Sequence, residues 1–203
     1  MTMQHQLSSL FHPASIAVLG ASERVGSVGH KVMTNLIRNQ FQGNLFPVNP
    51  KHRTVLKYPC YPSVADIDQK VDLAIITTPA VSVPALLQQC GECGIQSVII
   101  ISAGFSEMGE TGKALEKSML EIAKKYHIRF VGPNCLGVMR PSAHLNATFD
   151  NNQALPGKIA LVSQSGAICA AILDWALERQ IGFSAIVSMG NSSDLDFGDM
   201  LDY

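Results

Sequence analysis

The sequence predicts an α/β fold in which a doubly wound parallel sheet is followed by the start of a second α/β unit. Short apolar segments typical of buried strands alternate with longer segments of helical periodicity along the 203 residues. Hydrophobic residues make up 47% of the chain and charged residues only 15%, as expected where parallel strands are buried on both faces. The connections between these segments are short, which favours consecutive strand–helix–strand units.

The first unit alternates strands and helices from Ser15 to Val131. Its predicted strands are Ser15–Leu19, Asn44–Val48, Val71–Thr77, Ser97–Ser102 and Ile128–Val131. Its predicted helices are Ser27–Asn39, Ser82–Cys93 and Glu110–Tyr126. In the second helix Ser82 is a candidate N-cap, and Pro84 is tolerated because it falls in the first turn. This order predicts a parallel sheet with helices on both faces.

A second unit begins after a less regular stretch from Gly132 to Pro156. It comprises a strand over Lys158–Val162, a helix over Gly166–Arg179, a strand over Phe183–Ser188 and a helix beginning near Asp196. Such a piece is small for an independent core. We therefore expect either that the chain is a fragment of a longer protein or that the second unit packs against the first.

The segment Ile16–His30 is an apolar strand that runs into a glycine-rich turn and then a helix. Gly20, Gly26 and Gly29 would let the backbone turn sharply and let a phosphate approach closely. A helix that begins near Ser27 would point unpaired N–H groups and the positive end of its dipole at that phosphate. The spacing differs from the dinucleotide pattern G-x-G-x-x-G, so a phosphate loop is predicted without NAD as the default ligand. The alternative is a turn that only packs the helix on the sheet.

The chain after the second strand carries basic residues where an NAD site needs an acidic one. An NAD-binding fold places a carboxylate about 20 residues beyond the fingerprint, where it holds the ribose hydroxyls. This sequence has Lys51 and Arg53 there. The pattern favours a ligand with an additional phosphate, such as coenzyme A with its 3′-phosphate, or NADP. Both cations could also be ordinary solvated charges of a loop.

A second glycine-containing turn, Ser163–Gly166, joins a predicted strand to the start of a helix. A nucleophile elbow of the form G-x-S-x-G would need glycine at position 163, where this chain has serine, so a hydrolase is disfavoured. The backbone N–H groups of Ser165, Gly166 and Ala167 would instead be available to a phosphate at the helix N-terminus. The alternative is that Ser165 only caps the helix.

The five cysteines and six histidines show no spacing typical of a metal site. An odd number of scattered cysteines argues for free thiols. Cys90 and Cys93 have the spacing of a redox or metal pair, but they end a predicted helix, whereas a redox pair usually opens one. No second cysteine pair or spaced histidine pair completes a zinc site. We therefore predict no metal ligands.

Charge and hydropathy argue against two classes of partner. The net charge of -1 provides no basic footprint for nucleic acid. No apolar run reaches the length of a membrane span. The segment Met1–Leu10 is polar and lacks the apolar core of a signal peptide. These features predict a cytoplasmic protein.

Six motifs fall in one order and span essentially the whole chain. They are Gly20-Ala-Ser22 with Gly26 and Gly29, Val48-Asn-Pro-Lys51, Gly132-Pro-Asn-Cys-Leu-Gly137, Leu145-Asn-Ala-Thr-Phe149, Val162-Ser-Gln-Ser-Gly166 and Ile172-Leu-Asp-Trp-Ala176. Together they resemble the amino-terminal region of the ADP-forming (NDP-forming) acyl-CoA synthetases, which are relatives of the succinyl-CoA synthetase α subunit. The same region opens bacterial protein lysine acetyltransferases that carry a synthetase-like domain.

The resemblance implies three parts: a Rossmann-like CoA-binding domain over 1–130, a connecting segment over 131–157, and the start of a flavodoxin-like ligase domain over 158–203. It places CoA contacts at successive strand ends and at one later turn. The implied CoA-binding residues are Gly20, Ala21, Ser22, Val25, Gly26, Lys51, Thr78, Pro79, Ala80, Ser102, Ala103, Gly104 and Asn134. By the same resemblance Asn134 lies near the thiol, and the helix that begins at Ser165, Gly166 and Ala167 binds the transferred phosphoryl group.

The resembling enzymes convert acyl-CoA, phosphate and ADP reversibly to acid, CoA and ATP, through an acyl phosphate and a phosphohistidine. The resemblance places that histidine beyond Tyr203, so no catalytic residue is expected within this chain. ATP or ADP and Mg would bind only to domains absent from the chain, with an ATP-grasp domain or subunit as its partner. The chain itself would hold CoA or a CoA thioester.

Three alternatives to the synthetase stay open. They are the regulatory acyl-CoA-sensing domain of a protein lysine acetyltransferase, a stand-alone CoA-binding module, and a short NAD(P)-binding domain, which the basic loop after the second strand only partly excludes. Gly166 follows Ser165 as it does in the active synthetases, which favours the synthetase. The small residues Cys169 and Ala170 would permit a short acyl group.

Overall fold

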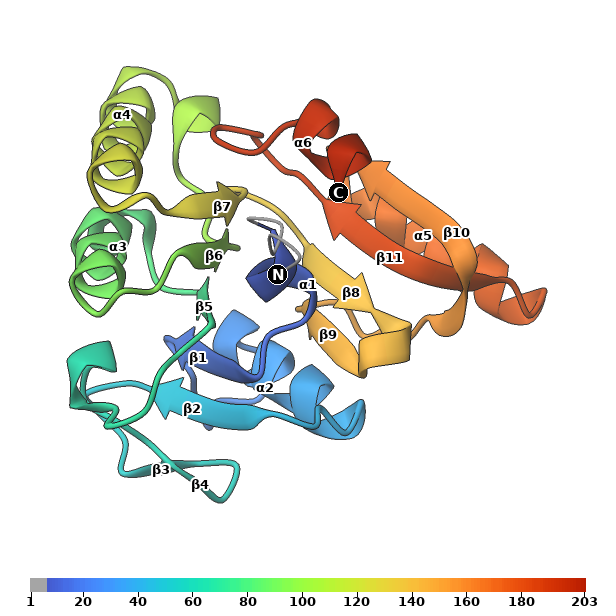
Figure 1. Cartoon of the computed structure of the whole chain (residues 1–203), viewed down its shortest axis with the longest axis horizontal. Coiled ribbons are helices and arrows are strands. Elements are labelled where there is room, and N and C mark those ends of the chain that lie inside the picture. Colours follow the sequence, from blue (N-terminus) through green and yellow to red (C-terminus); the bar gives the residue numbers. More distant parts are fainter. Residues whose placement is uncertain (1–6) are drawn as a thin grey trace, which may run out of the picture.

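The structure, a computed structural model, describes residues 7–203 and contains a five-stranded and a four-stranded sheet that lie next to each other (Figure 1). A two-stranded ribbon of β3 (Thr54–Val55) and β4 (Tyr58–Pro59) lies beside the first of them. Residues 1–6, which enter the argument for a cytoplasmic protein, lie outside the described residues. None of the helices within 7–203 is long and apolar enough to cross a membrane.

The first sheet is entirely parallel, with strand order β2-β1-β5-β6-β7. Its strands are β1 (Ser15–Leu19), β2 (Asn44–Val48), β5 (Leu73–Ile76), β6 (Ser97–Ile100) and β7 (Arg129–Val131). Each coincides with a predicted strand or lies within one. Alternate side chains enter two separate cores, so that Ile75 lies in one and Ile76 in the other.

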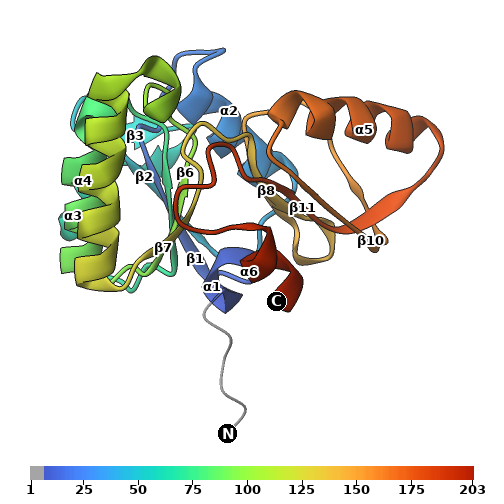
Figure 2. The ribbon, with the colours of Figure 1, turned by 90° about the horizontal axis from the view of Figure 1, so that it is seen from above.

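Helices cover both faces of this sheet (Figure 2), which confirms the predicted doubly wound fold. They are α2 (Val28–Arg38), α3 (Val83–Glu92) and α4 (Glu110–Tyr126). Val32, Met33 and Leu36 of α2 are fully buried on one face, while α3 and α4 bury their apolar sides on the other. Burial of each such large side chain stabilises the fold by roughly 1.5–3 kcal/mol.

The start of α3 differs from the predicted one. Ser82 precedes the helix, but its hydroxyl donates to the carbonyl oxygen of Pro79 and to Thr78 Oγ1 and caps no helical N–H group. The reason is a 3₁₀ turn, η2 (Ala80–Ser82), that leads into α3. The other short helices and 3₁₀ turns are α1 (Ser8–Phe11), η1 (Val64–Asp66), η3 (Ser106–Met108), η4 (Pro141–Ala143) and α6 (Phe197–Asp202).

The second sheet is mixed, with strand order β10-β11-β8-β9. Its strands are β8 (Gly137–Arg140), β9 (Leu145–Thr148), β10 (Leu155–Ser163) and β11 (Gly182–Ser188). β10 and β11 are parallel, whereas β8 pairs antiparallel with both β11 and β9. The prediction of a less regular stretch over 132–156 is therefore wrong. β8 and β9 are only four residues long, and their pairing with distant chain leaves no local period to detect.

One helix, α5 (Gly166–Glu178), covers one face of β10 and β11 (Figure 2). Leu173 and Phe183 lie in the core between them. On the outer side of α5, Ile168 and Trp175 remain 53% and 52% exposed. β10 forms one edge of the sheet, and residues 156–160 of it are exposed. This part of the fold is therefore less covered than the first sheet.

The two sheets share a core. Met33 and Ile75 of the first unit belong to the same buried cluster as Val138 and Val187 of the second. The second unit thus packs against the first, which was one of the two expectations from its small size.

A carboxylate on α4, Glu116, also holds the loop after β11 against the first unit. The Ser193 hydroxyl donates to Glu116 Oε1 at 2.7 Å, and the Ser106 backbone N–H donates to Oε2 at 3.1 Å. Burial raises the pKa of Glu116, but hydrogen bonds from Ser106, Ser193 and Asn191 lower it by more, so the pKa lies below its ordinary value. These hydrogen bonds therefore favour the ionised form of Glu116. The contact of Glu116 with Ser106, Ser193 and Asn191 is called the Glu116 contact below.

Candidate functional site

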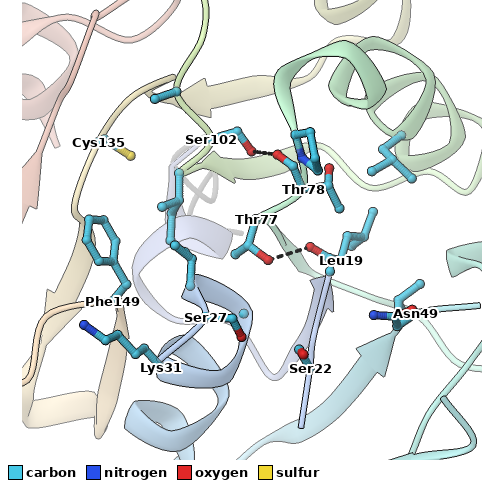
Figure 3. Close-up of a pocket in the computed structure, with 18 of the residues that line it drawn as sticks. Leu19, Ser22, Ser27, Lys31, Asn49, Thr77, Thr78, Ser102, Cys135 and Phe149 are labelled. Atoms are coloured by element: carbon cyan, nitrogen blue, oxygen red, sulfur yellow. Dashed lines mark hydrogen bonds between the residues drawn. The ribbon is translucent and has the colours of Figure 1, made fainter. Parts of the chain in front are cut away.

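A cavity of about 1290 Å³ lies at the carboxyl ends of β1, β2, β5 and β6 and reaches the start of α5 (Figure 3). An open parallel sheet binds its ligands at this edge, because the loops after neighbouring strands meet there. The volume exceeds the range of roughly 300–1,000 Å³ that is typical of small-molecule sites. The cavity therefore has room for a large, extended ligand.

Ten of the sixteen residues expected at the site line this cavity. They are Gly20, Ser22, Lys51, Thr78, Pro79, Ser102, Ala103, Asn134, Gly166 and Ala167. These residues come from both units of the chain. The fold therefore brings strand ends that are far apart in sequence to one wall, as the parallel order predicts.

The other six expected residues do not line the main cavity. Ala21 is fully buried beneath the turn. Val25 is 84% exposed and, with Gly26, lines a smaller neighbouring hollow of about 240 Å³. Ala80, Gly104 and Ser165 each follow or precede a lining residue in sequence without being part of the wall.

Two glycines shape the turn after β1 in different ways. Gly20 has a φ of +93°, a conformation that side chains other than glycine rarely adopt. Gly29 lies inside α2, where a Cβ atom would overlap the carbonyl oxygen of Gly20. Gly29 therefore permits the helix to pack on the turn and does not itself turn the chain, which corrects the role expected for it.

The N-terminus of α2 opens on the cavity. Val28 and Gly29 are its first residues and line the wall, and N–H groups in a first helical turn have no acceptor within the helix. Ser27 caps the helix by accepting a hydrogen bond from the His30 N–H at 3.3 Å. The wall also contains three cations, Arg24, Lys31 and Lys51. This end of the cavity is suited to phosphate groups.

The chain after β2 contributes an amide and a lysine to the same end. Asn49 Nδ2 donates to the carbonyl oxygen of Ala21 at 2.8 Å, and Asn49 Oδ1 accepts the Lys51 N–H at 3.0 Å. Asn49 therefore ties the end of β2 to the glycine turn after β1. Asp150, at the opposite wall, is the only carboxylate among the described lining residues. No acidic group thus stands where a ribose-binding carboxylate of an NAD site belongs.

Small hydroxyl-bearing side chains form the middle of the wall (Figure 3). Thr77 Oγ1 donates to the carbonyl oxygen of Leu19 at 3.0 Å, and Ser102 Oγ donates to that of Thr78 at 2.5 Å. These bonds join the ends of neighbouring strands. They leave a wall of short polar side chains along which an extended ligand can lie.

The far end of the cavity is built by the second unit and by the chain that leads to it. Its residues are Asn134, Cys135, Leu136, Phe149, Asp150, Asn151, Gly166, Ala167 and Ala170. Ser165 caps α5 by accepting the Ile168 N–H at 3.3 Å. The first two residues of α5, Gly166 and Ala167, line the wall, so the N-terminus of this helix also lies at the cavity. A second anion could be held there.

A thiol near the far end is unreactive. Cys135 is buried, its Sγ donates to the carbonyl oxygen of Ile100 at 3.4 Å, and burial raises its pKa to about 12. A thiol with such a pKa is protonated at neutral pH and is a poor nucleophile. Cys135 is therefore part of the wall and takes no part in thiol chemistry.

The sequence-based set lacks several residues of the wall. Arg24 and Lys31 flank the glycine turn and helix start, and a search for cations near the phosphate loop would have found them. Phe149, Asp150 and Asn151 directly follow β9, and no local pattern indicates the position of β9 beside α2. The missed residues thus fall into two groups, those overlooked and those that only the fold reveals.

Neither cysteines nor acidic residues form a metal site within residues 7–203, where no group of three or more histidine, cysteine, aspartate or glutamate side chains could hold a metal ion. Cys90 is buried and Cys93 is exposed. Burial raises the pKa of Cys90 to about 12. A thiol of this kind lacks the low pKa of a redox-active cysteine pair.

The model of the CoA binding domain family matches residues 14–141. The chain belongs to this family. A second model, that of the succinyl-CoA ligase like flavodoxin domain, matches residues 156–203. The two matches confirm the resemblance and the two-part fold class drawn from the sequence motifs. The CoA-binding domain match includes β8, whereas the predicted boundaries at residues 130 and 157 stay a prediction.

Several known proteins that are similar to this chain are ADP-forming acid–CoA ligases. The alpha subunit of an ADP-forming acetate–CoA ligase from Pyrococcus furiosus is 45% identical over 97% of the chain, which spans 44% of that subunit. An ADP-forming 4-hydroxybutyrate–CoA ligase from Nitrosopumilus maritimus is 45% identical over 96% of the chain, which spans 28% of it. The solved structure of an acetyl-coenzyme A synthetase from Candidatus Korarchaeum cryptofilum, in complex with phosphate and ADP, matches 98% of the chain with a TM-score of 0.93 at 38% identity. The chain covers 42% of that structure.

Proposed function

We propose that this chain is the CoA-binding or acyl-CoA-binding portion of an ADP-forming acyl-CoA synthetase, an acid–thiol ligase. The observation that carries the proposal is a single cavity with a helix N-terminus at each end: α2 beside three cations, and α5 beside a wall of mixed polar and apolar residues. Such a cavity can hold a long ligand with phosphates at one end and a reacting group at the other. The names of the related acetate–CoA and 4-hydroxybutyrate–CoA ligases support the same activity.

The residues present fit coenzyme A. Its pyrophosphate would bind at the turn after β1 and the start of α2, where Gly20 leaves no room for a side chain against Thr77. Lys51 and Arg24 would pair with phosphate charges. The pantetheine arm would follow Thr78, Ser102 and Ala103, and the thiol would reach Asn134 and the start of α5. Lys51 in place of an acidic residue would favour CoA over NAD.

The reaction as a whole needs groups outside this chain. The synthetase reaction forms an acyl phosphate from acyl-CoA and phosphate, and the phosphoryl group then passes through a histidine to ADP. We place no catalytic residue among the six histidines of the chain. ADP or ATP and Mg would be held by an ATP-grasp domain or subunit of the same cytoplasmic enzyme. The start of α5, with Ser165, Gly166 and Ala167, would stabilise the phosphoryl group in transfer.

Filling the middle of the cavity tests this proposal. Ala103 is exposed on the wall, so Ala103→Trp can be accommodated by the fold but obstructs the proposed pantetheine path. Ala114, exposed on α4 away from the cavity, provides the matched control Ala114→Trp. In calorimetric titrations with CoA we expect at least a tenfold loss of affinity for Ala103→Trp and none for Ala114→Trp. Equal CoA affinity of the two folded variants would overturn the placement.

A further inference from the structure

A buried amide on α2 holds the loop that forms one wall of the far end of the cavity. Asn35 is 6% exposed, and its Nδ2 donates to the carbonyl oxygens of Thr148 at 2.8 Å and Asp150 at 2.6 Å. The two acceptors lie on either side of Phe149 in sequence. One side chain therefore fixes the backbone before and after Phe149, more than a hundred residues away along the chain.

The same loop is also held from its own unit. Thr148 Oγ1 donates to Asn146 Oδ1 at 2.7 Å, and Asn146 Nδ2 donates to the carbonyl oxygen of Asn152 at 3.4 Å. Asn152 Nδ2 in turn donates to the carbonyl oxygen of Ala170 on α5 at 3.4 Å. The polar side chains of the motif Leu145–Phe149 thus form hydrogen bonds that hold the loop after β9. Asn35 is its only connection to α2 by a side-chain hydrogen bond within the described residues.

The position of Asn35 separates its effect from that of the CoA-binding residues. It lies outside the main cavity, which Phe149, Asp150 and Asn151 line, but it lines the smaller neighbouring hollow together with Gly26 and Lys31. The N-terminus of the same helix faces the phosphate end. A change at Asn35 should therefore act first on the 148–151 loop, whereas Asn49 keeps its hydrogen bonds to Ala21 and Lys51, which do not involve Asn35.

The chemistry of the contact explains why asparagine is suited to this position. Two carbonyl oxygens need donors, because buried polar groups without partners are costly. An asparagine amide supplies two N–H groups from one nitrogen. Aspartate has nearly the same shape but presents only acceptors when ionised, and serine supplies a single, shorter donor.

We infer that Asn35 is a positioning residue for the acid substrate: it sets Phe149 and the 148–151 loop against the site where the acyl group reacts. The inference rests on the proposed function, which places the thiol and the acid at the far end of the cavity. Asn35 touches neither CoA nor the acid and acts through the loop. Its loss should therefore raise the KM for the acid and leave CoA binding nearly unchanged.

Three variants and two kinds of measurement test the inference. Asn35→Asp removes both donors at constant shape, and Asn35→Ser keeps one. Asn39→Asp makes the same change at the C-cap of α2, where the amide donates to the backbone carbonyl oxygen of Asn35 and, among the described residues, forms no hydrogen bond with the 148–151 loop. In this chain, amide hydrogen exchange over residues 149–152 and CoA titration report the loop and the phosphate end. In the assembled ligase, steady-state kinetics with acetate separate the KM for the acid from kcat.

For Asn35→Asp we expect at least tenfold faster exchange over residues 149–152, at least a tenfold rise in the KM for acetate, and a CoA dissociation constant within threefold of wild type. Asn35→Ser should show a smaller change of the same kind, and it carries the test if Asn35→Asp does not fold. Asn39→Asp should behave as wild type. Unchanged exchange and unchanged KM in a folded Asn35 variant would overturn the inference. A wild-type chain that binds no CoA would instead count against the proposed function, and the exchange data would still decide whether Asn35 holds the loop.

Discussion

The two sheets of this chain differ in how completely their strands are covered. In the first sheet every strand residue of β5 and β6 is buried, and helices lie on both faces. In the second sheet β10 forms an edge with five consecutive exposed residues, and α5 leaves apolar side chains in solvent. One core of the first unit, between its sheet and the helices α3 and α4, contains no residue of the second unit, whereas its other core is shared with that unit. The candidate site lies where the two units meet.

The largest expected effect is a difference in stability between the sheets. Ile75 in the central strand β5 is fully buried, whereas Ile159 in the edge strand β10 is 54% exposed. Ile75→Ala should lower the free energy of unfolding by about 2–5 kcal/mol, because it removes packed atoms and leaves a cavity. Ile159→Ala should change it by less than about 0.5 kcal/mol. Urea denaturation followed by circular dichroism measures both, and equal losses would break the comparison.

A smaller effect is expected on CoA affinity when one lysine from each unit is replaced. Lys51 lies at the phosphate end of the cavity, whereas Lys158 lies on the exposed part of β10. Lys51→Met should weaken CoA binding about tenfold, or about 1.4 kcal/mol, through loss of a charge-assisted contact. Lys158→Met should leave the affinity unchanged. Titration at two salt concentrations checks the cause, since the loss should shrink at high salt. An equal loss in both variants would point to net charge alone.

The smallest expected effect is the loss of stability when the Glu116 contact is weakened. Burial raises the pKa of this carboxyl, but its hydrogen bonds to Ser106, Ser193 and Asn191 lower it overall below the ordinary value of 4.5. A depressed pKa in the folded state stabilises the fold above the ordinary pKa, and this contribution disappears as pH falls through the folded-state pKa. Glu116→Gln should therefore cost about 1 kcal/mol near neutral pH and progressively less below pH 4.5.

The control for the Glu116 variant is Glu121→Gln, a change at an exposed position of the same helix. Thermal unfolding of both variants and wild type between pH 3 and pH 7 gives the comparison. If the stabilities of wild type and Glu116→Gln changed with pH in parallel, protonation of Glu116 would not contribute to the pH dependence of stability. Loss of stability in Glu121→Gln would assign the effect to the charge of α4 instead.

The same contrast between the sheets explains how much of the fold the sequence predicts. Strands of the first sheet are continuous apolar runs, because both of their faces are buried, and such runs are visible locally. β8 and β9 are four residues each and exist through pairing with β11 and with each other. The helix α1 was also missed, since its four residues give no period to detect. The elements predicted from the sequence are those with a strong local pattern, and the missed elements are those too short to show one.

The residues of the candidate site also fall into those that the sequence predicts and those that depend on tertiary packing. Gly20, Lys51, Thr78 and Ser102 could be placed at one edge because parallel strands all end there. Phe149 and its loop could not, since their approach to the cavity depends on how β9 packs beside α2. Gly29 was assigned the right region and the wrong role, because close backbone packing shows only in three dimensions.

Titration of the unmodified chain with CoA, with NADP as the competing dinucleotide, tests the central claim most directly. The cavity with its basic, phosphate-directed end and no ribose-binding carboxylate predicts saturable CoA binding at micromolar concentration, with one site per chain and no heat from NADP. Binding of NADP with equal or greater affinity, or no binding of CoA to the folded chain, would contradict the claim that this cavity is a coenzyme A site.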